Sequence, residues 1–421
     1  MAAPVVREYL RAMRYRLGSA LAGALTLPLL AACGDDTDPH FPPTEVQYGL
    51  VSTDLDGDGF PDVVGTRMLV EDAGPPFTAS LEVYRHPGAG GGSFGAATRY
   101  GNGHDPWFLA AADLDGDTLP DIVSASVADG GLAIFYSNAA QPGTLETRQL
   151  LGSPGASQLA IADLNADGHA DLVAADYGVS LFVQDAAAPG TFLAPLGLHP
   201  GGANWVAVGD LNGDALPDIS VTDAYSVKLF FHAADATSTH FQAPVSVHVQ
   251  TPNAHFLGAN AVAIADVTGD GRNDLVITDP GPTGGGAPFV AVLAQDPASA
   301  GQFLAAANYA IATHNVGHCV VVADLSGDGL ADIVVGGSDA LSVLRQDAAN
   351  PGRFLAAQDY ATPLGAYQVA LADLNGDGRV DIVVTNGATT PTVNGMVTTH
   401  PGVLYQDSAN PGVFLALQDL P

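Results

Sequence analysis

The chain has 421 residues, of which 47% are hydrophobic and only 14% are charged, and its 45 acidic and 13 basic residues give a formal net charge of -32. This balance lacks the basic footprint that nucleic-acid phosphates require, so we expect no binding to DNA or RNA. The 50 glycines and 29 prolines are typical of many short strands joined by tight turns, and Lys and Glu are too scarce for a protein built on long helices.

The first 33 residues differ in character from the rest of the chain. Four arginines (Arg7, Arg11, Arg14 and Arg16) precede an apolar stretch from Leu17 to Leu30, which at 14 residues is short for a membrane span. The stretch ends in Leu30-Ala31-Ala32-Cys33, which resembles the processing box of bacterial lipoproteins. We therefore expect a lipoprotein signal peptide over residues 1–33 with Cys33 lipidated, a tether over residues 34–45 and a folded domain over residues 46–421. An ordinary secretory signal with an incidental cysteine is the alternative.

The residue after Cys33 bears on the location of the protein. It is Gly34 and not aspartate, so the sequence carries no instruction for retention at the inner membrane. The expected location is the bacterial cell envelope, with the lipid on Cys33 in the outer membrane or at the cell surface.

A nine-residue acidic loop occurs seven times after the tether. The loops begin at Asp54, Asp113, Asp163, Asp210, Asp266, Asp324 and Asp373, with separations of 47 to 59 residues. This period predicts one supersecondary unit per repeat. Each loop has oxygen-bearing side chains at positions 1, 3, 5 and 9, the donors that a hard cation such as calcium needs. The loops hold about half of the 45 acidic residues, so metal binding explains much of the charge.

Apolar segments surround every loop in the same order. A strand of alternating large and small residues precedes the loop and a β-branched run follows it, so we expect the loop at the tip of a hairpin. A third strand comes next, and a fourth opens on an aromatic residue, such as Phe94 or Phe192, in six repeats. Four strands in each of seven repeats predict an all-β fold, a seven-bladed β-propeller of four-stranded blades. We expect the C-terminal strand, from Phe414 to Leu420, to close the ring by completing the first blade.

The loops, together with Phe94-Gly95-Ala96-Ala97 and the later Phe-Leu-Ala segments, resemble FG-GAP or VCBS repeats, the blades of integrin α-subunit heads and of many secreted bacterial proteins. The similarity extends over roughly Val46 to Pro421. It implies up to seven Ca²⁺ ions, one per repeat, bound by side chains at positions 1, 3, 5 and 9 and by a main-chain carbonyl at position 7, which is Phe60 in the first loop. The implied side-chain ligands are Asp54, Asp56, Asp58 and Asp62; Asp113, Asp115, Asp117 and Asp121; Asp163, Asn165, Asp167 and Asp171; Asp210, Asn212, Asp214 and Asp218; Asp266, Thr268, Asp270 and Asp274; Asp324, Ser326, Asp328 and Asp332; and Asp373, Asn375, Asp377 and Asp381.

Two loops depart from this pattern at position 6, where glycine permits a positive φ. Thr118 and Ala215 occupy that position in the second and fourth loops, so we expect strain there. The alternative for all seven loops is that the aspartates form Asx turns without a metal.

A candidate ligand face is expected opposite the acidic loops, where the first strand of each repeat begins. Aromatic, amide and imidazole side chains gather there: Tyr48, Trp107, Asn204, Trp205, Asn260, His318 and Tyr367. Such a mixture suits a small polar ligand such as a sugar. Long connections between the second and third strands of the first and seventh repeats are expected to form one wall beside it. The alternative is that these side chains fill the centre of the ring or pack between blades.

These features predict a calcium-binding, envelope-anchored propeller that binds an extracellular protein or glycan, without catalysis and as a monomer. Metalloprotease, serine-hydrolase and nucleotide-binding signatures do not occur in the sequence. Two alternatives stay open, because propellers host many functions. One is a scaffold for the assembly of envelope proteins, and the other is a polysaccharide-degrading hydrolase or lyase.

Overall fold

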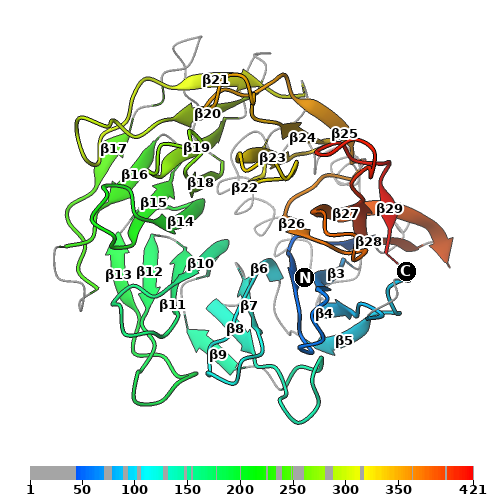
Figure 1. The fold of residues 1–421 in the computed structure, drawn as a ribbon. Coiled ribbons are helices and arrows are strands. Elements are labelled where there is room, and N and C mark those ends of the chain that lie inside the picture. The colour runs from blue at the N-terminus through cyan, green and yellow to red at the C-terminus, as the bar shows by residue number, and fades with distance from the viewer. Residues whose placement is uncertain are drawn as a thin grey trace, which may run out of the picture.

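The computed structural model describes residues 44–70, 78–88, 93–101, 106–126, 131–146, 149–152, 155–176, 178–199, 201–223, 226–233, 239–247, 249, 260–279, 288–312, 317–362, 364–393 and 396–420. The expected signal peptide with Cys33, and the expected tether up to residue 43, lie outside these ranges. Within them the chain forms strands and no helix, and so no helix there is able to cross a membrane. Figure 1 shows seven blades arranged in a ring, with the first blade beside the last.

Each blade is an antiparallel sheet of four strands that are consecutive in the chain. We call them A to D, from the centre of the ring outward. The first three blades are β2 (Leu50–Thr53), β3 (Asp62–Val70), β4 (Thr78–Tyr84) and β5 (Thr98–Gly101); β6 (Pro106–Ala112), β7 (Asp121–Ser126), β8 (Gly131–Phe135) and β9 (Gln149–Gly152); and β10 (Gln158–Ala162), β11 (Asp171–Ala175), β12 (Val179–Phe182) and β13 (Leu196–His199).

The fourth to seventh blades repeat this order, which confirms the predicted seven-bladed all-β fold. They are β14 (Trp205–Gly209), β15 (Asp218–Thr222), β16 (Val227–Phe230) and β17 (Val245–Val247); β18 (Val262–Ala265), β19 (Asp274–Asp279), β20 (Phe289–Leu293) and β21 (Ala307–Ala310); β22 (Cys319–Ala323), β23 (Asp332–Gly336), β24 (Ala340–Leu344) and β25 (Gln358–Ala361); and β26 (Val369–Ala372), β27 (Asp381–Val393), β28 (Met396–Leu404) and β29 (Gln418–Asp419).

The hydrophobic core lies between the blades. Seven clusters of buried side chains occur, and each joins one blade to the next around the ring. Strand B is buried along its length, as in β7 and β15, because its two faces pack against two different blades. A strand whose two faces are both apolar is therefore one that lies between two neighbouring blades and packs against each of them.

The ring closes differently from the prediction. The C-terminal strand β29 pairs with β28 of its own blade, with Gly402 opposite Asp419, and β5 supplies the fourth strand of the first blade. The expectation that the C-terminal strand completes the first blade was therefore wrong. A short connection, bridged by Gln406 and Phe414, keeps the last strand beside the strand that precedes it. A hydrophobic cluster that includes Leu50 and Leu420 joins the first and seventh blades.

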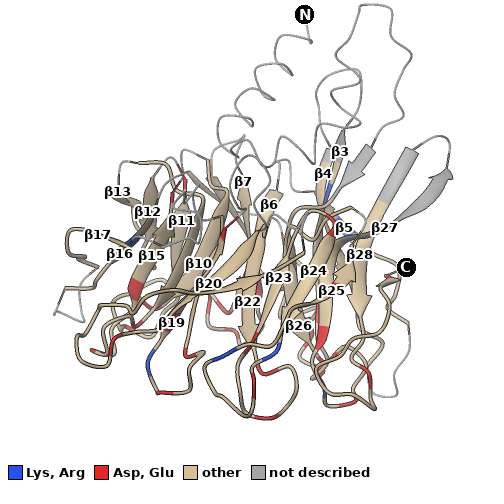
Figure 2. Cartoon of the chain, turned by 90° about the horizontal axis from the view of Figure 1, so that it is seen from above, with Lys and Arg blue, Asp and Glu red and all other residues tan. Residues whose placement is uncertain are grey.

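The N-terminal strand β1 (Thr44–Val46) also contributes to this closure. It pairs antiparallel with the extended end of β3 and parallel with β28, so the first and seventh blades share one sheet. Because β1 begins at Thr44, the expected tether boundary at residue 46 falls inside a strand. The long connections of these two blades are extensions of β3, β4, β27 and β28. Figure 2 shows the acidic positions, in red, concentrated in the loops at one end of the disc.

The fourth strands begin later than the sequence indicated. The aromatic residue expected at their start forms an isolated bridge to the end of strand C, as Phe192 does with Gln184, and β13 starts only at Leu196. The aromatic ring thereby enters the core ahead of the exposed edge strand.

Candidate functional site

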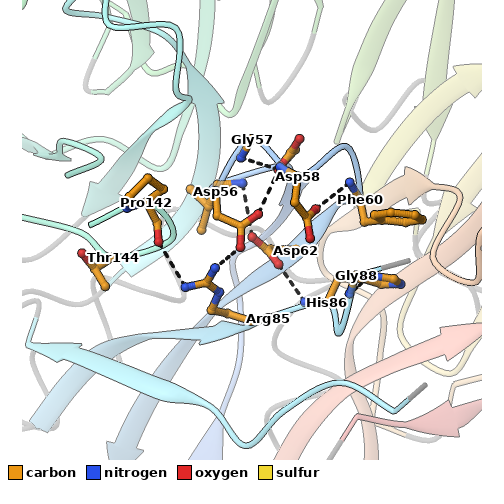
Figure 3. A network of polar contacts seen from close by, with 12 residues as sticks. Asp56, Gly57, Asp58, Phe60, Asp62, Arg85, His86, Gly88, Pro142 and Thr144 are labelled. Atoms are coloured by element: carbon orange, nitrogen blue, oxygen red, sulfur yellow. Dashed lines mark hydrogen bonds and ion pairs between the residues drawn. The ribbon is translucent and has the colours of Figure 1, made fainter. Parts of the chain in front are cut away.

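The first acidic loop curls around its own carboxylates (Figure 3). Asp54 accepts three backbone N–H groups of the loop at 2.7–3.1 Å, and Asp58 accepts the N–H of Phe60 at 2.9 Å. Carboxylate oxygens of Asp54, Asp56 and Asp58 can lie within 4.8 Å of one another. Three acidic side chains thus converge in a loop that the chain's own N–H groups hold in shape.

The other loops repeat this arrangement. Position 1 accepts the N–H of position 6 at 2.8–2.9 Å in the second to sixth loops and at 2.7 Å in the seventh. Asp113, Asp115 and Asp117 form a second group of carboxylates within 4.8 Å. An oxygen-only donor set of this kind fits Ca²⁺, and the Asx turns are compatible with it, because each oxygen that accepts one N–H keeps a second lone pair.

The aspartate at position 9 has a second role that the sequence did not indicate. Asp62 is buried, one of its oxygens accepts the N–H of Leu55 at 3.2 Å, and the other accepts the N–H of His86 at 2.7 Å. Burial raises the pKa of Asp62 to about 6 and that of Asp121 to about 7, against the smaller opposing effect of these hydrogen bonds. A buried carboxylate with a raised pKa is stabilised by a nearby cation.

Three loop residues other than glycine have a left-handed backbone. Thr118 (φ 77°) and Ala215 (φ 65°) occupy position 6, as expected, and Ala166 (φ 54°) occupies position 4, which the sequence analysis did not single out. The second, third and fourth loops therefore have the same backbone shape as the others, and the residue with the left-handed backbone is strained in each of them.

A column of buried residues, each two positions after the end of a strand C, contacts the acidic loops, and five of them join one loop to the loop of the preceding blade. We call them the clamp residues: His86, Ser137, Gln184, His232, Gln295, Gln346 and Gln406. Their backbone N–H groups donate to the aspartates at position 9 at 2.7–2.9 Å. Five of their side chains also reach the carbonyl oxygen of position 2 in the preceding blade's loop, at 2.7–3.1 Å. In four blades the clamp residue is the glutamine of a Gln-Asp pair, which the sequence repeats at 184–185, 295–296, 346–347 and 406–407.

Arg85 connects the first loop to the second blade. Its guanidinium group forms an ion pair with Asp56 and donates to the carbonyl oxygen of Pro142 at 3.2 Å (Figure 3). One of the four carboxylates of this loop is thereby already compensated. The third to seventh loops have a neutral side chain at position 3 instead.

Four of the predicted ligand residues form a continuous arc on the opposite face. Trp107 stacks on Tyr48 with ring centroids 4.4 Å apart, Tyr48 contacts Tyr367 at 5.3 Å, and Tyr367 stacks on His318 at 4.7 Å. These rings come from the second, first, seventh and sixth blades. We call this set the aromatic arc. It exists because the closed ring brings the two ends of the chain together.

The backbone of the aromatic arc is held rigidly. Thr66 of β3 accepts the N–H groups of Tyr48 and Gly49 at 3.1 and 2.9 Å, and Thr385 of β27 accepts the N–H of Tyr367 at 2.9 Å. Burial lowers the pKa of His318 to about 4, so its imidazole is neutral at physiological pH. The indole Nε1–H of Trp107 has no hydrogen-bond partner among the described residues.

The structure separates the other predicted ligand residues from the aromatic arc. Trp205 meets Phe108 edge-on at 5.5 Å across the ring and packs against clusters of the fourth to seventh blades. It therefore fills the centre, as the alternative interpretation held. Asn204 and Asn260 precede strand A of the fourth and fifth blades, with their N–H groups bonded to strand B.

The fold and the loops define a closed seven-bladed propeller with an acidic loop at the end of each A–B hairpin. The chain belongs to the FG-GAP-like repeat family, which matches residues 54–124, 115–174, 163–221, 210–277, 266–335 and 324–384. A search of curated proteins returned no match.

Solved structures with the same fold are distant in sequence. Sqt1 from Chaetomium thermophilum is 14% identical, with a TM-score of 0.53 and 91% of each chain covered. A candidate 6-phosphogluconolactonase from Bacteroides fragilis is 15% identical, with a TM-score of 0.53 over 76% of this chain and 85% of its own. One from Bacteroides uniformis is 14% identical, with a TM-score of 0.50 over 76% of this chain and 86% of its own. At this identity the likeness shows the fold alone.

Proposed function

We propose that the protein is a calcium-binding propeller, anchored to the bacterial cell envelope through a lipid on Cys33, that binds an extracellular glycan at the aromatic arc without catalysis. The observation that carries this proposal is the contact of Trp107, Tyr48, Tyr367 and His318 across four blades on one face. Sugar rings present flat C–H faces and hydroxyl groups, and both find partners on aromatic rings with polar edges.

The form of the aromatic arc supports a binding role. The rings belong to rigid strand ends, so little conformational entropy is lost when a ligand stacks on them. Trp107 and Tyr367 are half-buried, so each keeps an exposed part of its ring on which a sugar could stack. On this face β3 and β27 continue beyond their pairing with strand A, and they would limit how a glycan approaches.

The acidic loops support the calcium part of the proposal. Converging carboxylates would repel one another without a cation, and seven sites at one end of the disc would hold the blade junctions in place. The loops are on the face opposite the aromatic arc, so the ions would act on stability and not on ligand contact.

Glu82 and Cys319 are residue types that can act in catalysis, but both are buried in this fold. Glu82 is buried, where it accepts hydrogen bonds from Tyr84 at 2.8 Å and Arg99 at 2.9 Å. Burial raises the pKa of the Cys319 thiol to about 12, so this cysteine stays protonated at neutral pH. Both observations favour binding over catalysis.

A glycan array with the mature chain tests the proposal. We expect specific hits that Trp107→Ala reduces more than tenfold, while Trp107→Phe, which keeps an aromatic ring against Tyr48, reduces them less. Calcium-dependent melting serves as the control for folding. No glycan hit from a folded, calcium-responsive protein would reject the glycan, and release of reducing ends from a hit would favour the hydrolase or lyase.

A further inference from the structure

Five blade junctions are filled in the same way, by a glycine in the connection between strands C and D of the following blade. These glycines are Gly143, Gly190, Gly301, Gly352 and Gly412, with φ between 70° and 82°. A Cβ atom at any of them would lie no more than 3.4 Å from an atom of the preceding blade. The distance is 2.8 Å at Gly301 and Gly412, closer than a Cβ atom normally packs, and the positive φ favours glycine at all five positions.

The glycine meets two positions on the preceding blade. One is position 3 of the acidic loop, occupied by Asp115, Thr268 or Ser326. The other is the residue directly after strand C, occupied by Arg85, Tyr136, Phe231 or Arg345. We call the space between these two positions the turn seat. In the first two blades the turn also accepts a hydrogen bond there, from Arg85 to Pro142 and from Tyr136 to Gly190.

The junction between the third and fourth blades lacks this glycine. The connection of the fourth blade runs from His232 to its bridge partner Phe241, is one residue longer than its counterpart from Gln184 to Phe192, and contains no glycine. Residues 234–238 of this connection lie outside the described residues.

A cavity of about 310 Å³ is present at this junction. It is lined by Asn165, Val183, Leu193, Ala194, Leu196, Thr239 and His240. Asn165 is position 3 of the third loop, and Val183 directly follows β12. These are the two positions that the glycine turn meets at other junctions, so the cavity coincides with the turn seat of the third blade.

The walls of this open seat are suited to a peptide. Leu193 and Leu196 are 53% and 49% exposed, and they give it an apolar outer wall. Asn165, Thr239 and His240 add side chains that can form hydrogen bonds. The same shape already accommodates a polypeptide turn five times in this molecule.

We propose that the open seat between the third and fourth blades binds a glycine turn, of the Pro-Gly type, presented by another polypeptide. The partner would insert the turn as the blades insert their own, with glycine against Asn165 and Val183 and the preceding residue against Leu193 and Leu196. The site is on the acidic-loop side of the rim and does not depend on the glycan proposal. A protein partner there would leave the aromatic arc free.

The probe is a cyclised peptide of residues 346–354, the turn of the sixth blade (QDAANPGRF), because cyclisation preforms the turn. We expect saturable one-to-one binding to the full chain by calorimetry. Replacing the peptide's glycine with alanine should weaken binding about fivefold, since its φ of 82° in the protein strains any other residue. Absence of saturable binding, or equal binding of the alanine peptide, overturns the proposal.

Matched variants locate the binding. Leu193→Arg should weaken binding about tenfold or more. Leu304→Arg should have no effect, because Leu304 holds the same place in the fifth blade, where Gly352 fills the seat. Exchange of residues 233–240 for residues 347–353 should fill the open seat, abolish peptide binding and raise the melting temperature. An exchanged, folded protein that still binds the peptide contradicts the proposal, as does displacement of the peptide by monosaccharides.

Discussion

His86 of the first blade lies 3.1 Å from the carbonyl oxygen of Leu374 in the seventh, through its Nε2 atom. Its Nδ1 accepts the N–H of Gly88 at 3.0 Å, so Nε2 carries the proton and donates to Leu374. The same contact joins four other pairs of blades, through His232 in one and through Gln295, Gln346 and Gln406 in the others. The first and seventh blades are thus joined by the same kind of contact that joins blades elsewhere in the ring.

The clamp predicts how this junction responds to substitution. His86→Gln should leave the free energy of unfolding within about 0.5 kcal/mol of the wild type, because Gln295, Gln346 and Gln406 make the same bond elsewhere. His86→Ala should cost about 1–3 kcal/mol, since it leaves a buried carbonyl without a donor. Urea unfolding of both variants provides the measurement, and equal losses would contradict the clamp.

Calcium removal should lower the melting temperature of the whole disc. One site filled at 100 times its dissociation constant stabilises a fold by about 2.7 kcal/mol, and several sites act on the same ring. Scanning calorimetry in chelator, and again after calcium is restored, measures the effect. Superimposable melts in the two conditions would exclude calcium as a structural ligand.

Without calcium, stability should fall as pH rises from about 4 to about 7. Burial raises the pKa of Asp62, Asp171, Asp218 and Asp381 to about 6 and that of Asp121 to about 7, above the value of 3.8 for an exposed carboxyl. The folded state then binds more protons than the unfolded state over this range, so the free energy of unfolding decreases with pH. Denaturation in chelator at half-unit pH steps tests the sign. Calcium should remove the decline, because it favours the charged carboxylates.

Strain at position 6 of the loops can be tested in both directions. Thr118→Gly should stabilise the protein by about 1 kcal/mol, because it relieves a φ of 77° at a residue other than glycine. Gly271→Ala is the reciprocal change, at a φ of 84° with no atom within 4 Å of the added Cβ, and it should cost a similar amount. If both variants melt at the wild-type temperature, the left-handed conformation carries no strain.

Trp205→Ala should destabilise the propeller by about 3 kcal/mol, since its ring packs against clusters of the fourth to seventh blades. Trp107→Ala should cost less, because Trp107 belongs to none of the seven hydrophobic clusters of the described residues. Thermal melting of the two variants separates a packing role from a surface role, and an unchanged melt for Trp205→Ala would place this ring outside the core.

The repeat itself determined much of the architecture. An acidic loop between two apolar strands specifies a hairpin through local chemistry alone, and seven of them specify seven blades. The sequence also predicted the strain at Thr118 and Ala215, because the loop requires a positive φ at position 6 whatever surrounds it.

Tertiary structure decided the features that depend on which blades are neighbours. The sequence could not show that β29 stays in the seventh blade, because an edge strand can pair with either side of a closing ring. Nor could it bring Tyr48 beside Tyr367, which are far apart in the chain and meet only when the ring closes. The same holds for the cavity at Asn165 and Val183, because two neighbouring blades together supply its walls.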